Sequence, residues 1–173
     1  MLWAICLTQC LVDLMHDHSY NWRGQTIAAQ VFFLVLVLGG GSSIGLMTGP
    51  GEWFAGLVKP SINPPSWVFA PVWSILYVFI AVAGCRTWLR DRDGAAMKLW
   101  WAQLFLNFLW SPVFFGAHRI DAALVVIVLL LATMFAYVLR VYRRDKIAAL
   151  LCAPYLAWVS FATILNAAFL WIN

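Results

Sequence analysis

Amide and aromatic side chains recur at helical spacing along one uncharged stretch of this chain. Gln103, Asn107 and Trp110 are separated by four and three residues, so they share one face of a helix. The same face continues through Ser111 and Phe114. An amide in hydrocarbon is costly unless it finds a hydrogen-bonding partner, so we expect this face to look into the interior of a helix bundle.

Two further stretches also place a tryptophan on one helical face, and one of them adds an amide. Trp73 and Tyr77 lie four residues apart, and Trp158, Ala162 and Asn166 follow the same spacing nearer the end of the chain. Together, the three faces would line a flat and mostly apolar cavity, in which rings supply contact area and amides fix orientation. A planar aromatic ligand suits such a cavity. The alternative is that these side chains only pack against one another.

Tryptophan also gathers at membrane interfaces, where the ring lies at the level of the lipid headgroups. We expect that role for four other tryptophans: Trp88, Trp100, Trp101 and Trp171.

Other kinds of site lack their usual residues. The interiors of the uncharged stretches hold no Asp, Glu, Lys or Arg, so proton relays and charged ion paths are not expected. We find no paired carboxylates, no Ser-His-Asp set and no phosphate-binding loop. Cys85 and Cys152 stand alone and are expected to be small apolar packing residues.

The elements that carry these residues are defined by charge. All 11 Lys and Arg residues lie outside five uncharged stretches. About 20 apolar residues cross a hydrocarbon core roughly 30 Å thick, and within it the backbone must be helical. The sequence therefore predicts an all-α integral membrane protein, a five-transmembrane-helix bundle. Its expected spans are about 27–48, 66–86, 97–116, 120–142 and 147–171.

Composition supports this class, since 64% of the residues are hydrophobic and only 10% are charged. Soluble domains carry about 25% charged residues. The formal charge of +4 would suggest nucleic acid in a soluble protein, but here we expect membrane lipid and no nucleic acid as the partner.

We divide the chain into an N-terminal extension over 1–28, cytoplasmic or interfacial, and a five-helix membrane domain over 29–173. The extension has neither the basic start nor the small-residue cleavage site of a signal peptide. Structural zinc sites favour closer cysteine pairs than it offers, so we expect no metal site. The residues considered for one were Cys6, Cys10, His16 and His18.

The loops predict an orientation. Lys and Arg are retained on the cytoplasmic side of membranes, so the side with more of them should face the cytoplasm. One side has only Lys59 and Arg119. The other has nine basic residues: Arg23, Arg86, Arg90, Arg92, Lys98, Arg140, Arg143, Arg144 and Lys146. We therefore expect the N-terminus inside and the C-terminus outside, with the long loop from Thr48 to Ser66 also outside.

Three motifs resemble a known family. They are Lys59-Pro60 followed by NPPSWVFAPVWSILY over 63–77, AQLFLNFLWSPVFF over 102–115, and PYLAW over 154–158 with Phe161-Ala162-Thr163 and Leu165-Asn166. In order and spacing they are similar to those of the tryptophan-rich sensory protein (TspO) family, which includes the mitochondrial translocator protein. The resemblance covers about residues 30–173.

The resemblance implies a five-helix bundle, commonly a homodimer, that requires no cofactor. Members bind porphyrins such as protoporphyrin IX and heme, and also isoquinoline carboxamide ligands, between the helices under the first loop. The corresponding positions here are Trp53, Phe54, Trp73, Tyr77, Gln103, Asn107, Trp110, Trp158 and Ala162. Relatives often have Tyr where this chain has Phe54. The sterol motif of animal members, a Tyr followed by a basic residue, is missing from 166–173, so we expect no strong sterol recognition there.

Three functions are compatible with the resemblance. We favour a tetrapyrrole-binding sensor or regulator of porphyrin levels and oxidative stress. The second is a porphyrin transporter, although the chain lacks the half-to-half similarity that is common in transporters. The third is a light- and oxygen-dependent porphyrin-degrading enzyme, with Trp73 and Trp158 as redox partners. The lack of a targeting presequence favours a bacterial source.

Overall fold

A computed structural model of the chain describes residues 22–173, and every regular element within them is helical. The first rod is formed by α2 (Trp22–Leu34), one π-helical turn η1 (Val35–Gly39) and α3 (Gly40–Met47). The short helix α4 (Glu52–Gly56) and the 3-10 turn η2 (Ser66–Val68) follow, and η2 leads directly into α5 (Phe69–Asp91). The remaining elements are α6 (Ala95–Ser111), η3 (Pro112–Gly116), α7 (Ile120–Tyr142) and α8 (Lys146–Ile172).

Four helices in the described part of the chain are long and apolar enough to cross a membrane. They cover Thr26–Met47, Ser66–Asp91, Ile120–Tyr142 and Lys146–Ile172. These bounds agree closely with four of the five expected spans, which confirms an all-helical membrane protein. The fifth expected span corresponds to α6, which has 17 residues and continues into the π-helical turn η3.

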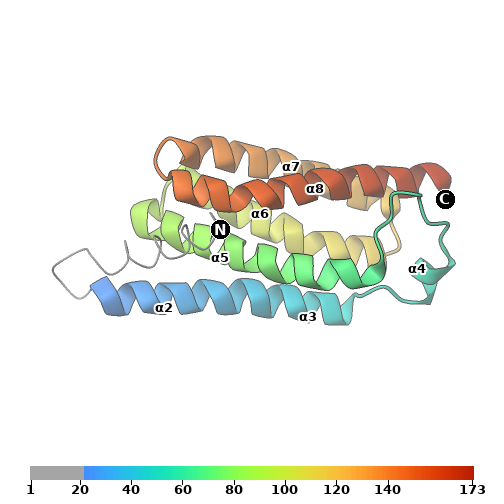
Figure 1. Ribbon diagram of the computed structural model, residues 1–173, viewed down its shortest axis with the longest axis horizontal. Helices are drawn as coiled ribbons and strands as arrows, with labels where there is room; N and C mark the ends of the chain where they lie inside the picture. Colours follow the sequence, from blue (N-terminus) through green and yellow to red (C-terminus); the bar gives the residue numbers. More distant parts are fainter. Residues whose placement is uncertain (1–21) are drawn as a thin grey trace.

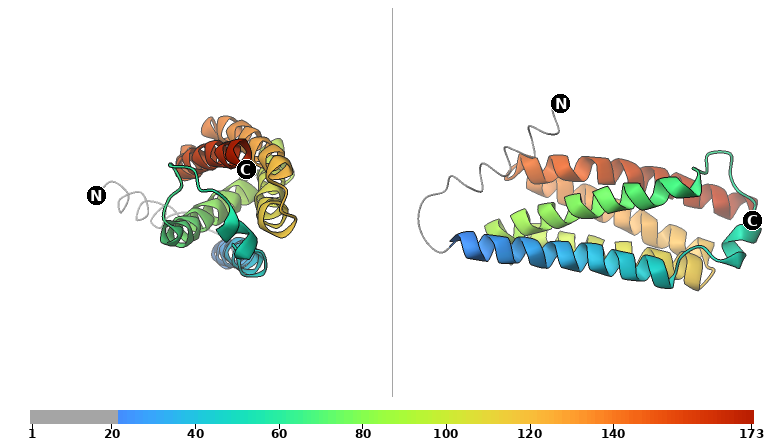
Figure 2. Two further views of the ribbon diagram at one scale, coloured as in Figure 1. Left: turned by 90° about the vertical axis from the view of Figure 1, so that its right-hand side faces the viewer. Right: turned by 60° about the horizontal axis from the view of Figure 1, so that its bottom comes forward.

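The long helices lie side by side in one elongated bundle (Figure 1). Helix α8 packs on α5 and α7, α6 packs on α7, and α2 packs on α5. The α5–α6 and α7–α8 connections share one end of the bundle with the start of α2. The opposite end holds α4, the η3–α7 connection and Asn173 (Figure 2). The two sets of loops expected on opposite sides of the membrane are thus at opposite ends of the bundle.

The loop from Thr48 to Ser66, expected to be non-helical, contains α4. The segment runs across the end of the bundle (Figure 2). It therefore forms a cap over the helices, and we refer to residues 48–66 as the cap segment.

Trp100 is a correction to the sequence analysis. We expected this ring at the membrane interface, but it is 1% exposed and its Nε1 donates to the Ile80 carbonyl at 3.0 Å. Gly84 makes the room, since a Cβ at that position would overlap the indole ring. Trp101 and Trp171, by contrast, are exposed, and their place at the membrane interface stays a prediction.

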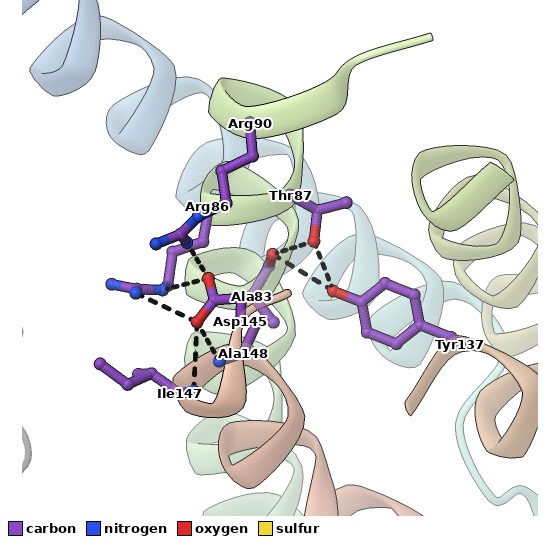
Figure 3. Close-up of polar contacts among 8 residues, drawn as sticks. All are labelled: Ala83, Arg86, Thr87, Arg90, Tyr137, Asp145, Ile147 and Ala148. Atoms are coloured by element: carbon purple, nitrogen blue, oxygen red, sulfur yellow. Dashed lines mark hydrogen bonds and ion pairs between the residues drawn. The ribbon is translucent and has the colours of Figure 1, made fainter. Parts of the chain in front are cut away.

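At the end of the bundle opposite the cap segment, an ionic cluster around the buried Asp145 joins α5 to the α7–α8 connection (Figure 3). Asp145, between α7 and α8, accepts hydrogen bonds from Arg86 at 2.9 and 3.1 Å and from Arg90. It also accepts from the Ile147 and Ala148 amides and so caps α8. Helix α5 was expected to end near Arg86 but continues to Asp91, which lets both arginines reach this carboxylate.

The pKa of Asp145 lies below its usual range. Burial opposes ionisation of this carboxyl, but the hydrogen bonds from Arg86 and the Ala148 amide and the charges of Arg86 and Arg90 outweigh it. The carboxylate is therefore ionised at neutral pH and ties α5 to the α7–α8 connection.

Cys85 and Cys152 are buried, as expected for packing residues. Residues 22–173 contain no group of His, Cys, Asp or Glu that could hold a metal ion. Cys6, Cys10, His16 and His18, and most of the proposed N-terminal extension, lie outside the described residues.

Candidate ligand site in the helix bundle

The first part of the candidate site lies where α5, α6 and α8 meet. The Trp73 and Tyr77 rings of α5 are in contact at a centroid distance of 5.3 Å, and Trp73 also meets Tyr155 of α8 at 6.3 Å. Asn107 of α6 donates its Nδ2–H to the Tyr155 hydroxyl at 2.7 Å. Three of the predicted residues are thus joined through Tyr155, which is fully buried.

Gly41 of α3 allows the first rod to approach this group. A Cβ at Gly41 would overlap the Tyr77 ring, whereas one at Gly45 would meet open space. Gly41 therefore serves close packing within the bundle, as small residues commonly do between membrane helices.

Gln103 precedes Asn107 by one turn of α6 and is 1% exposed. Neither its Nε2 nor its Oε1 has a hydrogen-bond partner in the structure. Buried side-chain amides in proteins are nearly always hydrogen-bonded, and an unpaired one costs about 1–3 kcal/mol. Gln103 therefore offers both a donor and an acceptor in the interior of the bundle.

The second part of the site lies beneath the cap segment. Trp53 and Phe54 of α4 both contact the Phe114 ring, at 5.9 and 6.2 Å. Phe54 also contacts Phe169 of α8 at 5.5 Å, and Trp53 stacks on His118 at 4.4 Å. These contacts seat α4 on an aromatic cluster formed by η3 and α8.

Polar contacts fix the cap segment at several points. The Thr48 and Ser111 hydroxyls are hydrogen-bonded at 2.9 Å, and the Asn173 side chain binds the backbone N–H and carbonyl of Val58 at 2.9 and 3.2 Å. Lys59 donates to the Phe54 and Leu57 carbonyls, and its ammonium lies 4.2 Å from the centre of the Phe54 ring. The cap is thus tied to both α6 and α8.

Trp110 connects the two parts. Its ring stacks on Phe114 at 5.2 Å, and its Nε1 donates to Asn166 of α8 at 3.1 Å. Asn166 in turn donates to the Ile120 carbonyl at the start of α7. The amides at 107 and 166 therefore pair with groups on neighbouring helices, as expected for amides facing the interior of a bundle.

The last two predicted residues lie on α8. Trp158 is half-buried and contacts Phe69 at 5.9 Å and Phe161 at 5.5 Å. Ala162, also half-buried, packs against the main core one turn further along.

The nine predicted residues thus lie on α5, α6, α8 and the cap segment. None of them is charged, so the site suits an apolar ligand with few polar groups. Two residues were missed: Tyr155 and His118. Tyr155 shares the helical face of Trp158 and Ala162 by spacing, which could have identified it. No local pattern could have placed His118 against Trp53.

Comparison with known proteins agrees with the motifs. The sequence matches the TspO/MBR family over residues 32–172. It is 39% identical over 132 residues to the tryptophan-rich sensory protein of Cereibacter sphaeroides, covering 74% of this chain and 81% of that protein. It is 34% identical to protein CrtK of Rhodobacter capsulatus over 145 residues, with 79% and 86% covered.

Similarity extends to animal proteins. The translocator protein of Sus scrofa is 39% identical over 141 residues, covering 78% of this chain and 83% of that protein. Because the family match spans most of the chain and includes all nine predicted site residues, this protein belongs to the TspO/MBR family.

Proposed function

We propose that this protein binds a tetrapyrrole such as protoporphyrin IX or heme among α5, α6 and α8 under the cap segment, and acts as a membrane sensor or regulator of porphyrin levels and oxidative stress. The observation that carries the proposal is Gln103, a fully buried amide with both polar atoms unpaired, on the same helical face as Asn107.

The chemistry of the site matches that class of ligand. A porphyrin is a flat ring with an apolar rim, so it gains contact area from rings such as Trp73, Tyr77 and Trp158. It also carries N–H donors, nitrogen acceptors and carboxyl groups that an amide can pair with. A ligand that pairs with Gln103 would remove the cost of leaving that amide unsatisfied. An isoquinoline carboxamide has the same combination of flat rings and one polar group.

The cap segment supports a sensing role. It is held by ring contacts and by a small set of hydrogen bonds, at Thr48, Lys59 and Asn173. A ligand beneath α4 would bear on the aromatic cluster that seats it. Ligand binding would thereby change the position of α4 at the surface of the bundle, where a partner protein could bind to it.

The membrane arrangement that we propose has α6 and η3 as the fifth span, because together they cover Ala95–Gly116, long enough to cross a bilayer. The end with the basic residues would lie in the cytoplasm, with the cap segment and Asn173 outside. A homodimer is the expected assembly.

Binding is tested by titrating protoporphyrin IX into the detergent-solubilised protein in the dark. Binding is followed by the absorbance of the bound porphyrin, because tryptophan variants change the fluorescence signal itself. Trp158→Leu should weaken saturable binding at least tenfold, a loss of about 1.4 kcal/mol. Trp171→Leu is the matched control, since that ring is 90% exposed. Equal affinities for both variants and the unsubstituted protein would refute the proposed site.

The complex with protoporphyrin IX also distinguishes the sensor proposal from the enzyme and transport hypotheses. Illumination in air tests the enzyme hypothesis, which requires a defined product that depends on Trp73. Porphyrin movement across vesicles containing the protein tests the transport hypothesis. If binding occurs without either result, the sensor or regulator proposal stands.

A further inference from the structure

Helix α7 has two opposite faces. Its buried residues recur every three or four positions: Ala123, Ile127, Leu130, Met134, Tyr137 and Val141. The opposite face is apolar and exposed, and includes Val125, Leu129, Phe135 and Leu139, each more than half exposed. No described element of the protein covers this outward strip.

The outward strip ends in two cations. Counting 3.6 residues per turn, Leu129, Ala136, Arg140 and Arg143 lie within one sector of the helix. Arg140 is in the last turn of α7, and Arg143 follows its end in a helical conformation. Both arginines are exposed. The apolar strip from Val125 to Leu139, about 21 Å long at 1.5 Å per residue, is thus continuous with a guanidinium pair at its end.

No carboxylate within residues 22–173 forms an ion pair with either of these arginines. The three carboxylates described at this end are already engaged, Asp91 by Arg144 at 3.0 Å, Asp93 by Arg92 at 3.4 Å, and Asp145 by Arg86 and Arg90. At this end of the bundle, four exposed basic residues make no ion pair with any residue that the structure describes: Lys98, Arg140, Arg143 and Lys146.

The free cations belong to neighbouring elements. Lys98 is near the start of α6, which packs on α7, and Lys146 begins α8. Both lysines are exposed and add positive charge to this end of the bundle. The opposite end of the bundle differs, since Lys59 is held by backbone carbonyls and Arg119 by Asp121 at 2.7 Å.

We propose that the outward strip of α7 is a binding site for an anionic phospholipid. The acyl chains lie along Val125 to Leu139, and the phosphate pairs with Arg140 and Arg143. Lys98 and Lys146 add attraction from either side. Charge complementarity selects this occupant, because an apolar partner helix would fit the strip but leave the guanidinium pair without a counter-charge.

The test is the association of spin-labelled phosphatidylglycerol and phosphatidylcholine with the full chain in bilayer discs, measured by electron paramagnetic resonance. Phosphatidylglycerol should be preferred in the unsubstituted protein. Arg140→Gln with Arg143→Gln should reduce that preference by roughly fivefold per residue removed. Raising the salt concentration should reduce it as well.

The matched control is Arg92→Gln with Arg144→Gln. It removes the same charge from the same end, but from residues that are already paired. The control should keep the preference. An equal loss in both double variants would mean a diffuse positive field and would overturn the proposal, as would displacement by inorganic phosphate at constant ionic strength.

A second copy of the chain on this face would also overturn the proposal. In that case Arg140→Gln with Arg143→Gln would lower chemical cross-linking between copies and leave lipid preference unchanged. If the double variant does not fold, Arg143→Gln alone, compared with Arg144→Gln alone, gives the same comparison with one charge removed.

Discussion

The Asn107 amide and the Tyr155 hydroxyl form a hydrogen bond of 2.7 Å that joins α6 to α8 in the middle of the bundle. Neither residue reaches solvent to any extent, since Tyr155 is 0% and Asn107 6% exposed. The contact therefore pairs two polar groups that would otherwise be unsatisfied beside the Trp73 ring, and it aligns the α6 and α8 faces that carry most of the candidate site.

Tyr155→Phe removes this partner while keeping the ring. The Asn107 amide then loses its hydrogen bond in a buried position, so unfolding in detergent should cost about 1–3 kcal/mol less. Tyr142→Phe is the control, because Tyr142 is 58% exposed and its loss should leave stability unchanged. Thermal unfolding followed by circular dichroism measures both. Equal stability of Tyr155→Phe and the unsubstituted protein would show that the hydrogen bond contributes little.

Gly41→Ala should weaken the packing of the first rod. The added Cβ overlaps the Tyr77 ring, so Tyr77 and its neighbour Trp73 must move. We expect a loss of stability of about 1–3 kcal/mol and weaker porphyrin binding. Gly45→Ala is the matched control on the same helix, since its Cβ meets open space. It should be neutral or stabilising by up to about 1 kcal/mol because alanine favours helix. A stable, tightly binding Gly41→Ala would contradict the close approach seen here.

Asp145→Asn should separate the two roles of this residue, which are to pair with Arg86 and Arg90 and to cap α8. Asparagine still caps α8, but it leaves Arg86, which is 14% exposed at its side chain, without its charged partner. Breaking a buried pair in this way costs about 3–5 kcal/mol, and Asp145→Ala should cost about 1 kcal/mol more by losing the cap. Denaturant unfolding of both variants measures the difference. If Asp145→Asn is as stable as the unsubstituted protein, the ion pairs contribute nothing net.

The Asp145 carboxyl should make the stability of the protein depend on pH. Its pKa is lower in the folded protein than the roughly 3.9 of an unfolded aspartate. The stability that it contributes is therefore fully present above about pH 4 and is lost as the pH falls towards the folded pKa. Unfolding measured from neutral pH downward should show this loss in the unsubstituted protein, and Asp145→Asn should show a smaller one. Parallel curves for the two proteins would contradict the assignment.

Four of the five spans were predictable to within a few residues, except that α5 extends beyond its expected end at Arg86. Uncharged length alone sets where a helix can cross a bilayer, and that information is local. The contacts of Asp145 were not predictable, because they join residues 59 positions apart. Trp100 was misplaced for the same reason, since only the missing Cβ of Gly84 shows that its ring turns inward.

The candidate site was predictable as helical faces but not as contacts. Spacing placed Gln103, Asn107 and Trp110 together, and two of these three do pair with α8. The sequence did not show that Gln103 would lack a partner. This depends on which hydrogen-bonding groups the facing helices place near it, and no local pattern contains that information. The tetrapyrrole ligand, the dimer and the orientation in the membrane stay predictions.

The central claim is that the unpaired amide of Gln103 is reserved for a ligand, and Gln103→Leu tests it most directly. An apolar side chain of similar size removes an unsatisfied group, so thermal stability without ligand should be unchanged or higher. Phe105→Leu, on the exposed face of the same helix, is the control. We predict that protoporphyrin IX affinity, measured in the dark, falls at least tenfold in Gln103→Leu only. Unchanged affinity together with lower stability would mean that Gln103 serves the fold and would contradict the account.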